Sequence, residues 1–168
     1  DDASGSLDPY RLPRHVVPHR YDLRLEPDLH SATFSGLAVV TVTVTQSTST
    51  VILNAVDLTI SSATLEGKTG GRLDATVELD QEMQRCRLTF PHPISAGESQ
   101  LTLVFQGTLN DHLRGFYRST YKDQAGVSHT MAATQFEATD ARRAFPCWDE
   151  PDFKAVFATT LVIDPSLT

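Results

Sequence analysis

The stretch TFSGLAVVTVTVT, residues 33–45, carries the longest strand pattern in this chain of 168 residues. Apolar side chains recur at every second position, a period that is typical of a β-strand with one buried face. That face consists of Phe34, Ala38, Val40, Val42 and Val44, while Ser, Leu, Val and Thr form the other. Gly36 interrupts the series, and we expect it to mark a β-bulge. The pattern therefore predicts one long strand.

Shorter strand patterns lie on both sides of this stretch. Tyr21, Leu23 and Leu25 alternate with charged residues, as expected of a half-buried strand. Further candidates are residues 50–53, 58–65, 75–79, 85–90, 101–107, 115–121, 127–131 and 155–163. Only residues 138–144 favour a helix, of two turns at most. Because strands do not alternate with helices, we predict an all-β fold, an antiparallel β-sandwich of about nine to eleven strands with at most one short helix.

The amino-terminal part divides into a tail and an extended lead-in. We assign residues 1–9 to a tail outside the fold, either disordered or left over from processing or cloning. Residues 9–18 contain three prolines, which favours an extended segment whose strand pairing is confined to a sheet edge. Residues 10–168 then form one domain, because no linker divides them.

The composition excludes several classes of protein. With 40% hydrophobic and 21% charged residues the chain is neither disordered nor fibrous, and its 37 Val, Ile and Thr residues favour strands. No apolar run approaches the roughly 18 residues that span a bilayer, so we expect no membrane partner. The net charge of −7 opposes sequence-independent binding to nucleic acid, which needs a basic surface.

The two cysteines, Cys86 and Cys147, are too few for a disulfide framework. They could form a single bridge, but two buried, reduced thiols are the favoured alternative. Because cysteine use is low, we expect the protein to be cytoplasmic.

The histidines give no convincing metal site. His15 and His19 have the i, i+4 spacing of zinc ligands on a helix. However, Pro18 opposes a helix, and no Glu follows His15. Nucleophile-elbow and phosphate-loop motifs are also absent from the sequence. We therefore expect no metal ligand and no catalytic residue here, and the chain does not resemble a complete enzyme.

One segment, residues 134–154, differs in kind from the strands. It reads TQFEATDARRAFPCWDEPDFK and mixes charged residues with the only tryptophan and three phenylalanines. For most of its residues we favour a structural role, in which the charges pair and the rings anchor the loop. Either arginine can pair with Asp149, Glu150 or Asp152. The residues we expect to support the loop are Arg142, Arg143, Trp148, Asp149 and Glu150.

Gln135 and Glu137 are the exceptions within that segment. They alternate around Phe136, so in an extended chain both side chains lie on one side and the ring lies on the other. A carboxylate can pair with an ammonium group, and an amide can donate to a carbonyl or accept from an amine. The residues alone leave two alternatives, a solvated strand end or a small polar binding site.

The same segment closely resembles part of the amino-terminal domain of the aminopeptidase N family of zinc metallopeptidases, of the bacterial membrane-alanyl type. The similar motifs are TQFE at 134–137, ARRA at 141–144, FPCWDEPD at 145–152 and FKAVF at 153–157. Further similar stretches are LPRHVVPHRYDLRL at 12–25, FSGLAVV at 34–40 and RGFY at 114–117. The likeness thus extends from about residue 10 to residue 168.

The resemblance implies a saddle-like β-domain that opens a larger zinc-dependent aminopeptidase, an enzyme that removes amino-terminal residues from peptides. The family's Gly-Ala-Met-Glu-Asn and His-Glu-x-x-His motifs do not occur in this sequence. Zinc would then be bound in the parent enzyme outside this chain, and the chain alone would be inactive. By the same resemblance, Gln135 binds the first residue of the substrate and Glu137 binds its free α-amino group.

The partners that the resemblance implies are the amino terminus of a peptide substrate and the enzyme's own catalytic domain. The alternative is a freestanding β-sandwich that binds a ligand or another protein. The two differ in what they expose, because a domain taken from a larger enzyme exposes the surface that packed on its neighbour.

Overall fold

The computed structural model describes residues 8, 10–68 and 71–167. Most of the predicted tail, residues 1–9, therefore lies outside the described residues. Within them the chain forms eleven strands and one 3₁₀ turn. These elements are β1 (Val16–Asp28), β2 (Thr33–Val44), β3 (Thr48–Asn54), β4 (Leu58–Gly67), β5 (Arg72–Asp74), β6 (Thr76–Asp80), β7 (Arg85–Ile94), β8 (Gly97–Thr108), β9 (Gly115–Lys122), β10 (Ser128–Gln135), η1 (Ala141–Arg143) and β11 (Val156–Leu161). The all-β prediction, its strand number and its single short helical segment are confirmed.

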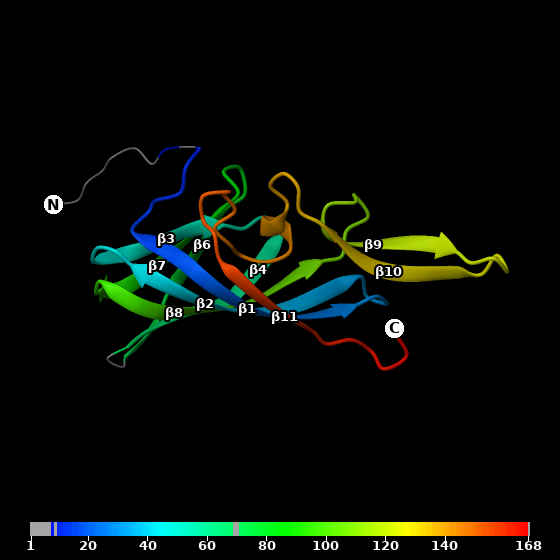
Figure 1. Cartoon of the computed structure of the whole chain (residues 1–168), viewed down its shortest axis with the longest axis horizontal. Coiled ribbons are helices and arrows are strands. Elements are labelled where there is room, and N and C mark those ends of the chain that lie inside the picture. Colours follow the sequence, from blue (N-terminus) through cyan, green and yellow to red (C-terminus); the bar gives the residue numbers. More distant parts are fainter. Residues whose placement is uncertain (1–7, 9, 69–70, 168) are drawn as a thin grey trace.

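The strands form three sheets (Figure 1). The largest has the order β11-β1-β2-β8-β4-β5, a second has the order β3-β7-β6, and β9 and β10 form a hairpin that projects from the body. Every pair is antiparallel except β1 with β11, which run parallel from Arg20 and Val156 to Leu25 and Leu161. The antiparallel prediction is thus right for all pairs but one. A parallel pair cannot be joined by a tight turn, and here β2 to β10 lie between the two strands in the sequence. Residues 136–155, which connect β10 to β11, we call the crossover.

The core is formed by the inward faces of the six-stranded and the three-stranded sheet. β2 contributes its alternating residues Phe34, Ala38, Val40, Val42 and Val44, none of them more than 2% exposed. β8, β4, β3 and β7 add buried aliphatic side chains to the same cluster. The period of two in the sequence therefore corresponds to the buried face of the sheet.

Gly36 does not form the expected bulge. The ladder is regular at Gly36, which lies opposite Leu25 on one side and Phe105 on the other. A Cβ atom at Gly36 would lie 2.3 Å from the Phe105 ring, so glycine is needed because the ring crosses the strand at this point. The ladders are irregular elsewhere, at His19 in β1, at Ser61 in β4 and between Thr48 and Thr50 in β3.

The lead-in joins β1 at Val16 and is paired differently along its length. Pro18 pairs only with β2, because the pairing of β1 with β11 begins at Arg20. The missing N–H of proline is tolerated on a side of the strand that has no neighbour. The predicted edge location therefore holds at Pro18, whereas from Arg20 onward β1 is an interior strand.

The two cysteines lie on opposite sides of β3. Cys86 of β7 pairs with Leu53, and Cys147 of the crossover pairs with Asn54 at the other edge. Two strand spacings, about 10 Å, exceed the roughly 7 Å allowed between the Cα atoms of a disulfide. Both thiols are free and buried, so of the two alternatives the reduced pair is correct. Burial raises the pKa of Cys86 to about 12 and that of Cys147 well above its ordinary value.

Replacing Gly36 with Ala should lower the free energy of unfolding by about 1–3 kcal/mol, because the added methyl group would have to displace the Phe105 ring. Gly67→Ala is the matched control, since its new Cβ would lie 3.9 Å from Ser99 Oγ, the nearest non-adjacent atom among the described residues. Urea denaturation measures both changes. Equal stability of Gly36→Ala and the unaltered chain would contradict the close approach of the ring.

The two thiols should resist alkylation in the folded chain. An ordinary thiol is partly ionised at pH 8, whereas Cys86, with a pKa of about 12, remains protonated. Raising the pH from 8 to 10 should therefore leave labelling by iodoacetamide slow, and denaturant should restore the normal rate. Mass spectrometry counts the labelled residues. Rapid labelling of either cysteine in the native chain at pH 8 would show that the thiols are accessible after all.

Candidate functional site

Gln135 and Glu137 flank the point where β10 ends. Gln135 is the last residue of β10 and pairs with Gly115, the first residue of β9. Both polar residues are exposed, whereas Phe136 between them is half-buried and packs edge-on against Phe145, with the ring centroids 5.8 Å apart. The ring therefore lies toward the domain and the two polar residues lie at its surface, in keeping with their alternation in the sequence.

The other described residues leave both polar side chains unengaged. In the part of the chain that the structure describes, no hydrogen bond or ion pair involves the Gln135 amide or the Glu137 carboxylate. Four hollows of about 250 to 610 Å³ lie elsewhere, and none of the four is lined by either residue. The pair is thus an open, solvated surface, where water weakens the attraction for a charged ligand.

An aromatic cluster attaches this surface to the six-stranded sheet. Phe145 packs edge-on against Tyr21 of β1 and Phe157 of β11, at centroid distances of 6.2 and 6.1 Å. Tyr21 and Phe157 stack in parallel at 4.6 Å. Aromatic pairs of this kind add roughly 0.5–1.5 kcal/mol each beyond simple burial. Because Phe136 contacts the cluster through Phe145, the position of the polar pair is tied to the sheet.

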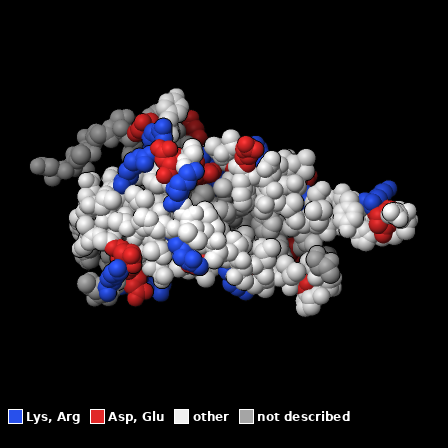
Figure 2. All heavy atoms as spheres, in the orientation of Figure 1, with Lys and Arg blue, Asp and Glu red and all other residues white. Residues whose placement is uncertain are grey.

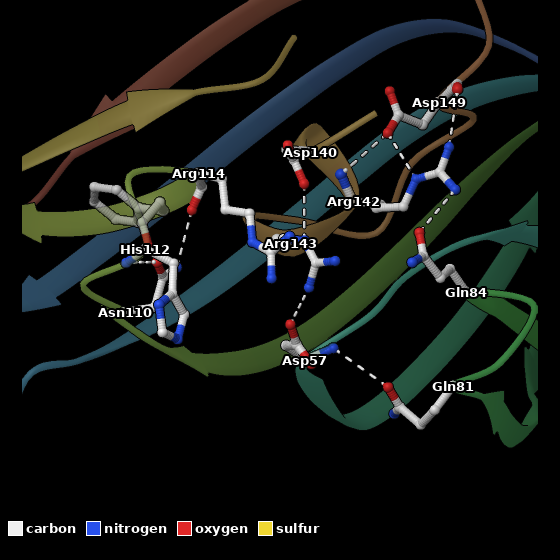
Figure 3. Close-up of polar contacts among 11 residues, drawn as sticks. Asp57, Gln81, Gln84, Asn110, His112, Arg114, Asp140, Arg142, Arg143 and Asp149 are labelled. Carbon is white, nitrogen blue, oxygen red and sulfur yellow. Dashed lines mark hydrogen bonds and ion pairs between the residues drawn. The ribbon is translucent and has the colours of Figure 1, made fainter. Parts of the chain in front are cut away.

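The Arg142 guanidinium holds the crossover by three hydrogen bonds (Figure 3). Its guanidinium donates to the Asp149 carboxylate (2.9 Å), to the Asp149 carbonyl oxygen (3.3 Å) and to the Gln84 side-chain oxygen (3.2 Å). The side chains of Arg142 and Asp149 are only 12% and 14% exposed. Water therefore competes little for either charge, and removal of one partner would leave the other charge buried.

Arg143, the next residue, lies between two carboxylates. Its Nε donates to Asp140 (2.8 Å), and its Nη1 contacts Asp57 in the turn between β3 and β4 (Figure 3). Asp140 belongs to the crossover itself, whereas Asp57 belongs to the body of the domain. Arg143 therefore connects the two.

Glu150 and Asp152 do not pair with the arginines of η1. Glu150 accepts the Leu12 N–H, and Asp152 pairs with Arg14 at 2.6 Å. Of the pairings that the sequence allowed, only Arg142 with Asp149 forms. The lead-in lies against the far end of the crossover, so its own arginines are the nearer partners of these two acids.

Trp148 anchors the middle of the crossover and is 4% exposed. Its backbone N–H donates to the Tyr21 hydroxyl (3.1 Å), and the next N–H, of Asp149, donates to Asn54 Oδ1 (3.2 Å). Asn54 also exchanges two backbone hydrogen bonds with Cys147, at 2.8 and 3.0 Å. Burial is the main cause that raises the pKa of Tyr21, so its hydroxyl stays protonated.

The residues that hold the crossover from outside carry no local sequence signal. These residues are Tyr21 on β1, Asn54 at the end of β3, Asp57 in the β3–β4 turn and Gln84 just before β7. Buried polar groups need partners. The one hint in the sequence was therefore the high density of charged residues in 134–154, which predicts that these side chains have partners but does not identify them.

The described residues contain no group of three or more His, Cys, Asp or Glu that could hold a metal ion. His19 Nε2 lies 2.8 Å from the Thr43 hydroxyl on the neighbouring strand, and His15 directly precedes β1. Because β1 is extended, the i, i+4 spacing does not place the two rings on one helix face. Residues 8, 10–68 and 71–167 therefore do not fit a zinc site. Over the same ranges the structure contains no helix with the length and apolar character needed to span a lipid bilayer.

Comparison with known proteins gives a consistent picture. A family model described as the peptidase M1 N-terminal domain matches residues 17–168. Aminopeptidase M1-D of Oryza sativa subsp. japonica is 47% identical over 157 residues, which cover 94% of this chain and 18% of that protein. Aminopeptidase M1 of Arabidopsis thaliana is 43% identical over 161 residues, with 94% and 18% covered. The mitochondrial aminopeptidase 2 of Saccharomyces cerevisiae is 44% identical over 162 residues, with 94% and 17% covered. The chain thus spans less than a fifth of the length of these relatives.

Arg142→Ala should lower the free energy of unfolding by about 3 kcal/mol, because the Asp149 carboxylate would lose its partner while remaining largely buried. Arg72→Ala is the control. Arg72 pairs with Asp74 at 3.4 Å, but both side chains are mostly exposed, so the loss should stay below about 1 kcal/mol. Chemical denaturation gives both values. Similar losses in the two variants would contradict the special role of the buried pair.

Proposed function

The chain belongs to the peptidase M1 N-terminal domain family, and on that premise we propose that it forms the substrate-pocket domain of a longer, zinc-dependent aminopeptidase. In this proposal Gln135 and Glu137 bind the first residue of a peptide and its free α-amino group. One observation carries the proposal: the two side chains are exposed and have no partner among the described residues, at a strand end that the aromatic cluster and η1 hold in place.

The chemistry of the pair suits an amino terminus. A carboxylate attracts an ammonium group, and the amide of Gln135 offers both a donor and an acceptor beside it. At about 4 Å the attraction between two unit charges is worth about 1 kcal/mol in water and about 4 kcal/mol near a protein surface. The open surface seen here would therefore bind firmly only when a second domain excludes water from it.

Glu137 is a positioning residue in this scheme, not a general base. By holding the ammonium group it would place the first peptide bond against groups that this chain does not contain, and orientation of that kind can contribute much of a rate enhancement. Zinc would be held by residues of the parent enzyme outside this chain, since the described residues do not fit it. The domain alone would accordingly have no peptidase activity.

The partner that completes the site would be the catalytic part of the same enzyme. β11 supports this, because it is an edge strand of the large sheet and its apolar residues Val156, Phe157 and Leu161 are each more than 50% exposed. The projecting hairpin exposes further apolar side chains, and Figure 2 shows few charges along it except near its tip. Exposed apolar side chains gathered on a strand and a hairpin are typical of a surface that is covered in the intact protein.

We also propose a cytoplasmic location. Its support is the pair of buried, unbridged thiols, which suits a reducing compartment.

Glu137→Ala in the full-length aminopeptidase should lower kcat/KM for substrates with a free amino terminus by about 10- to 100-fold, the value of one hydrogen-bonded charge. Glu82→Ala, a change in the turn before β7, is the control and should leave kcat/KM unchanged. Steady-state kinetics on an aminoacyl anilide measures both. A value of kcat/KM within about twofold of wild type for Glu137→Ala would remove the basis of this role.

A further inference from the structure

A continuous series of contacts leads from the β3–β4 turn to Gln135. We propose that Asp57, which no motif marks, is a positioning residue for the amine-binding pair and acts through Arg143 and Gly115. The inference rests on the proposed function of Gln135 and Glu137. It adds a residue almost 80 positions away in the sequence to the determinants of amino-terminal recognition.

The first link joins the body of the domain to η1. The Asp57 carboxylate contacts the Arg143 guanidinium, as Figure 3 shows. The turn that carries Asp57 is fixed to η1 by a second bond, in which the Val56 N–H donates to the Arg142 carbonyl oxygen at 3.1 Å. The carboxylate therefore projects from a backbone whose distance to η1 is already set.

The second link lies within η1. Arg143 is only 13% exposed and also donates to Asp140, three residues earlier. A contact inside one helical turn cannot fix that turn relative to the sheets. Among the described residues Arg143 contacts two carboxylates, and only Asp57 of these comes from the body, so it is the one that sets where the Arg143 side chain lies.

The third link reaches the binding pair. A Cβ atom at Gly115 would lie 2.6 Å from Arg143 Cβ, and Gly115 has a positive φ of 68°. Gly115 pairs directly with Gln135 across the hairpin. A parallel connection runs through the backbone, because the Asp140 N–H donates to the Phe136 carbonyl oxygen at 2.9 Å. Displacement of Arg143 would thus be passed to the residues on both sides of Phe136.

The exposure of Asp57 separates a positioning role from a stabilising one. Its side chain is 66% exposed, and exposed ion pairs contribute little to folding. Loss of its charge should leave the domain folded while it loosens Arg143. An effect confined to recognition of the α-amino group is what positioning predicts, and a purely structural role would not produce it.

The test is Asp57→Asn in the full-length aminopeptidase. Asn tolerates the positive φ of 58° at this position, so the substitution removes the charge without straining the backbone. KM for an aminoacyl anilide should rise about two- to fivefold with kcat unchanged, as expected when one exposed ion pair is lost. The inhibition constant of leucine hydroxamate should rise by the same factor. That of 4-methylpentanohydroxamic acid, which lacks only the α-amino group, should not change.

Two companion variants keep the outcomes distinct. Glu26→Gln removes another exposed carboxylate, one that lines the same 410 Å³ hollow as Asp57 but pairs with Arg24, and it should leave both inhibition constants unchanged. If Glu137→Gln weakens leucine hydroxamate selectively while Asp57→Asn does not, the role of Asp57 is overturned and the proposed function stands. If Glu137→Gln has no selective effect, the proposed function fails and the role of Asp57 fails with it. Equal weakening of the two hydroxamates by Asp57→Asn would also overturn the positioning role.

Discussion

The ion pair between Arg142 and Asp149 is the contact on which the arrangement of the candidate site depends. The crossover contains one 3₁₀ turn and no strand, so apart from the single bridge between Cys147 and Asn54 no ladder hydrogen bonds hold its path. Arg142 binds both the side chain and the backbone of Asp149 and reaches Gln84 at the β6–β7 connection. Because both charged side chains are largely shielded from water, the crossover has one arrangement that pairs the two charges and many that leave a charge without a partner.

The remaining contacts follow from this one. With the crossover in place, Phe145 lies against Tyr21 and Phe157, and Phe136 packs on Phe145 at the surface end of the cluster. The two polar residues beside Phe136 are then held by a rigid base while their own side chains stay open to solvent. This combination suits a half-site, which supplies a charge in a fixed position and leaves another domain to supply the walls that exclude water.

Much of the fold was predictable because burial imposes a period of two on each strand, as in Phe34 to Val44 of β2. The errors share a cause: Gly36 lies opposite the Phe105 ring and β11 lies parallel to β1, and both depend on neighbours distant in the sequence. At the site, the sequence predicted the alternation of polar side chains around Phe136 and the charge-rich crossover. The residues that bind the crossover from other elements were not predictable, because a partner supplied by another strand leaves no pattern near the residue it binds. These residues are Tyr21, Asn54, Asp57 and Gln84.

The proposed binding of the substrate's α-ammonium group by the Glu137 carboxylate can be tested with a crystal structure of the full-length enzyme that contains a bound, non-hydrolysable peptide. We expect a Glu137 oxygen about 2.7–3.2 Å from the peptide's α-nitrogen, with the Gln135 amide within hydrogen-bond distance of the first residue. A bound peptide whose α-nitrogen contacts other groups, with Glu137 still facing bulk solvent, would contradict it.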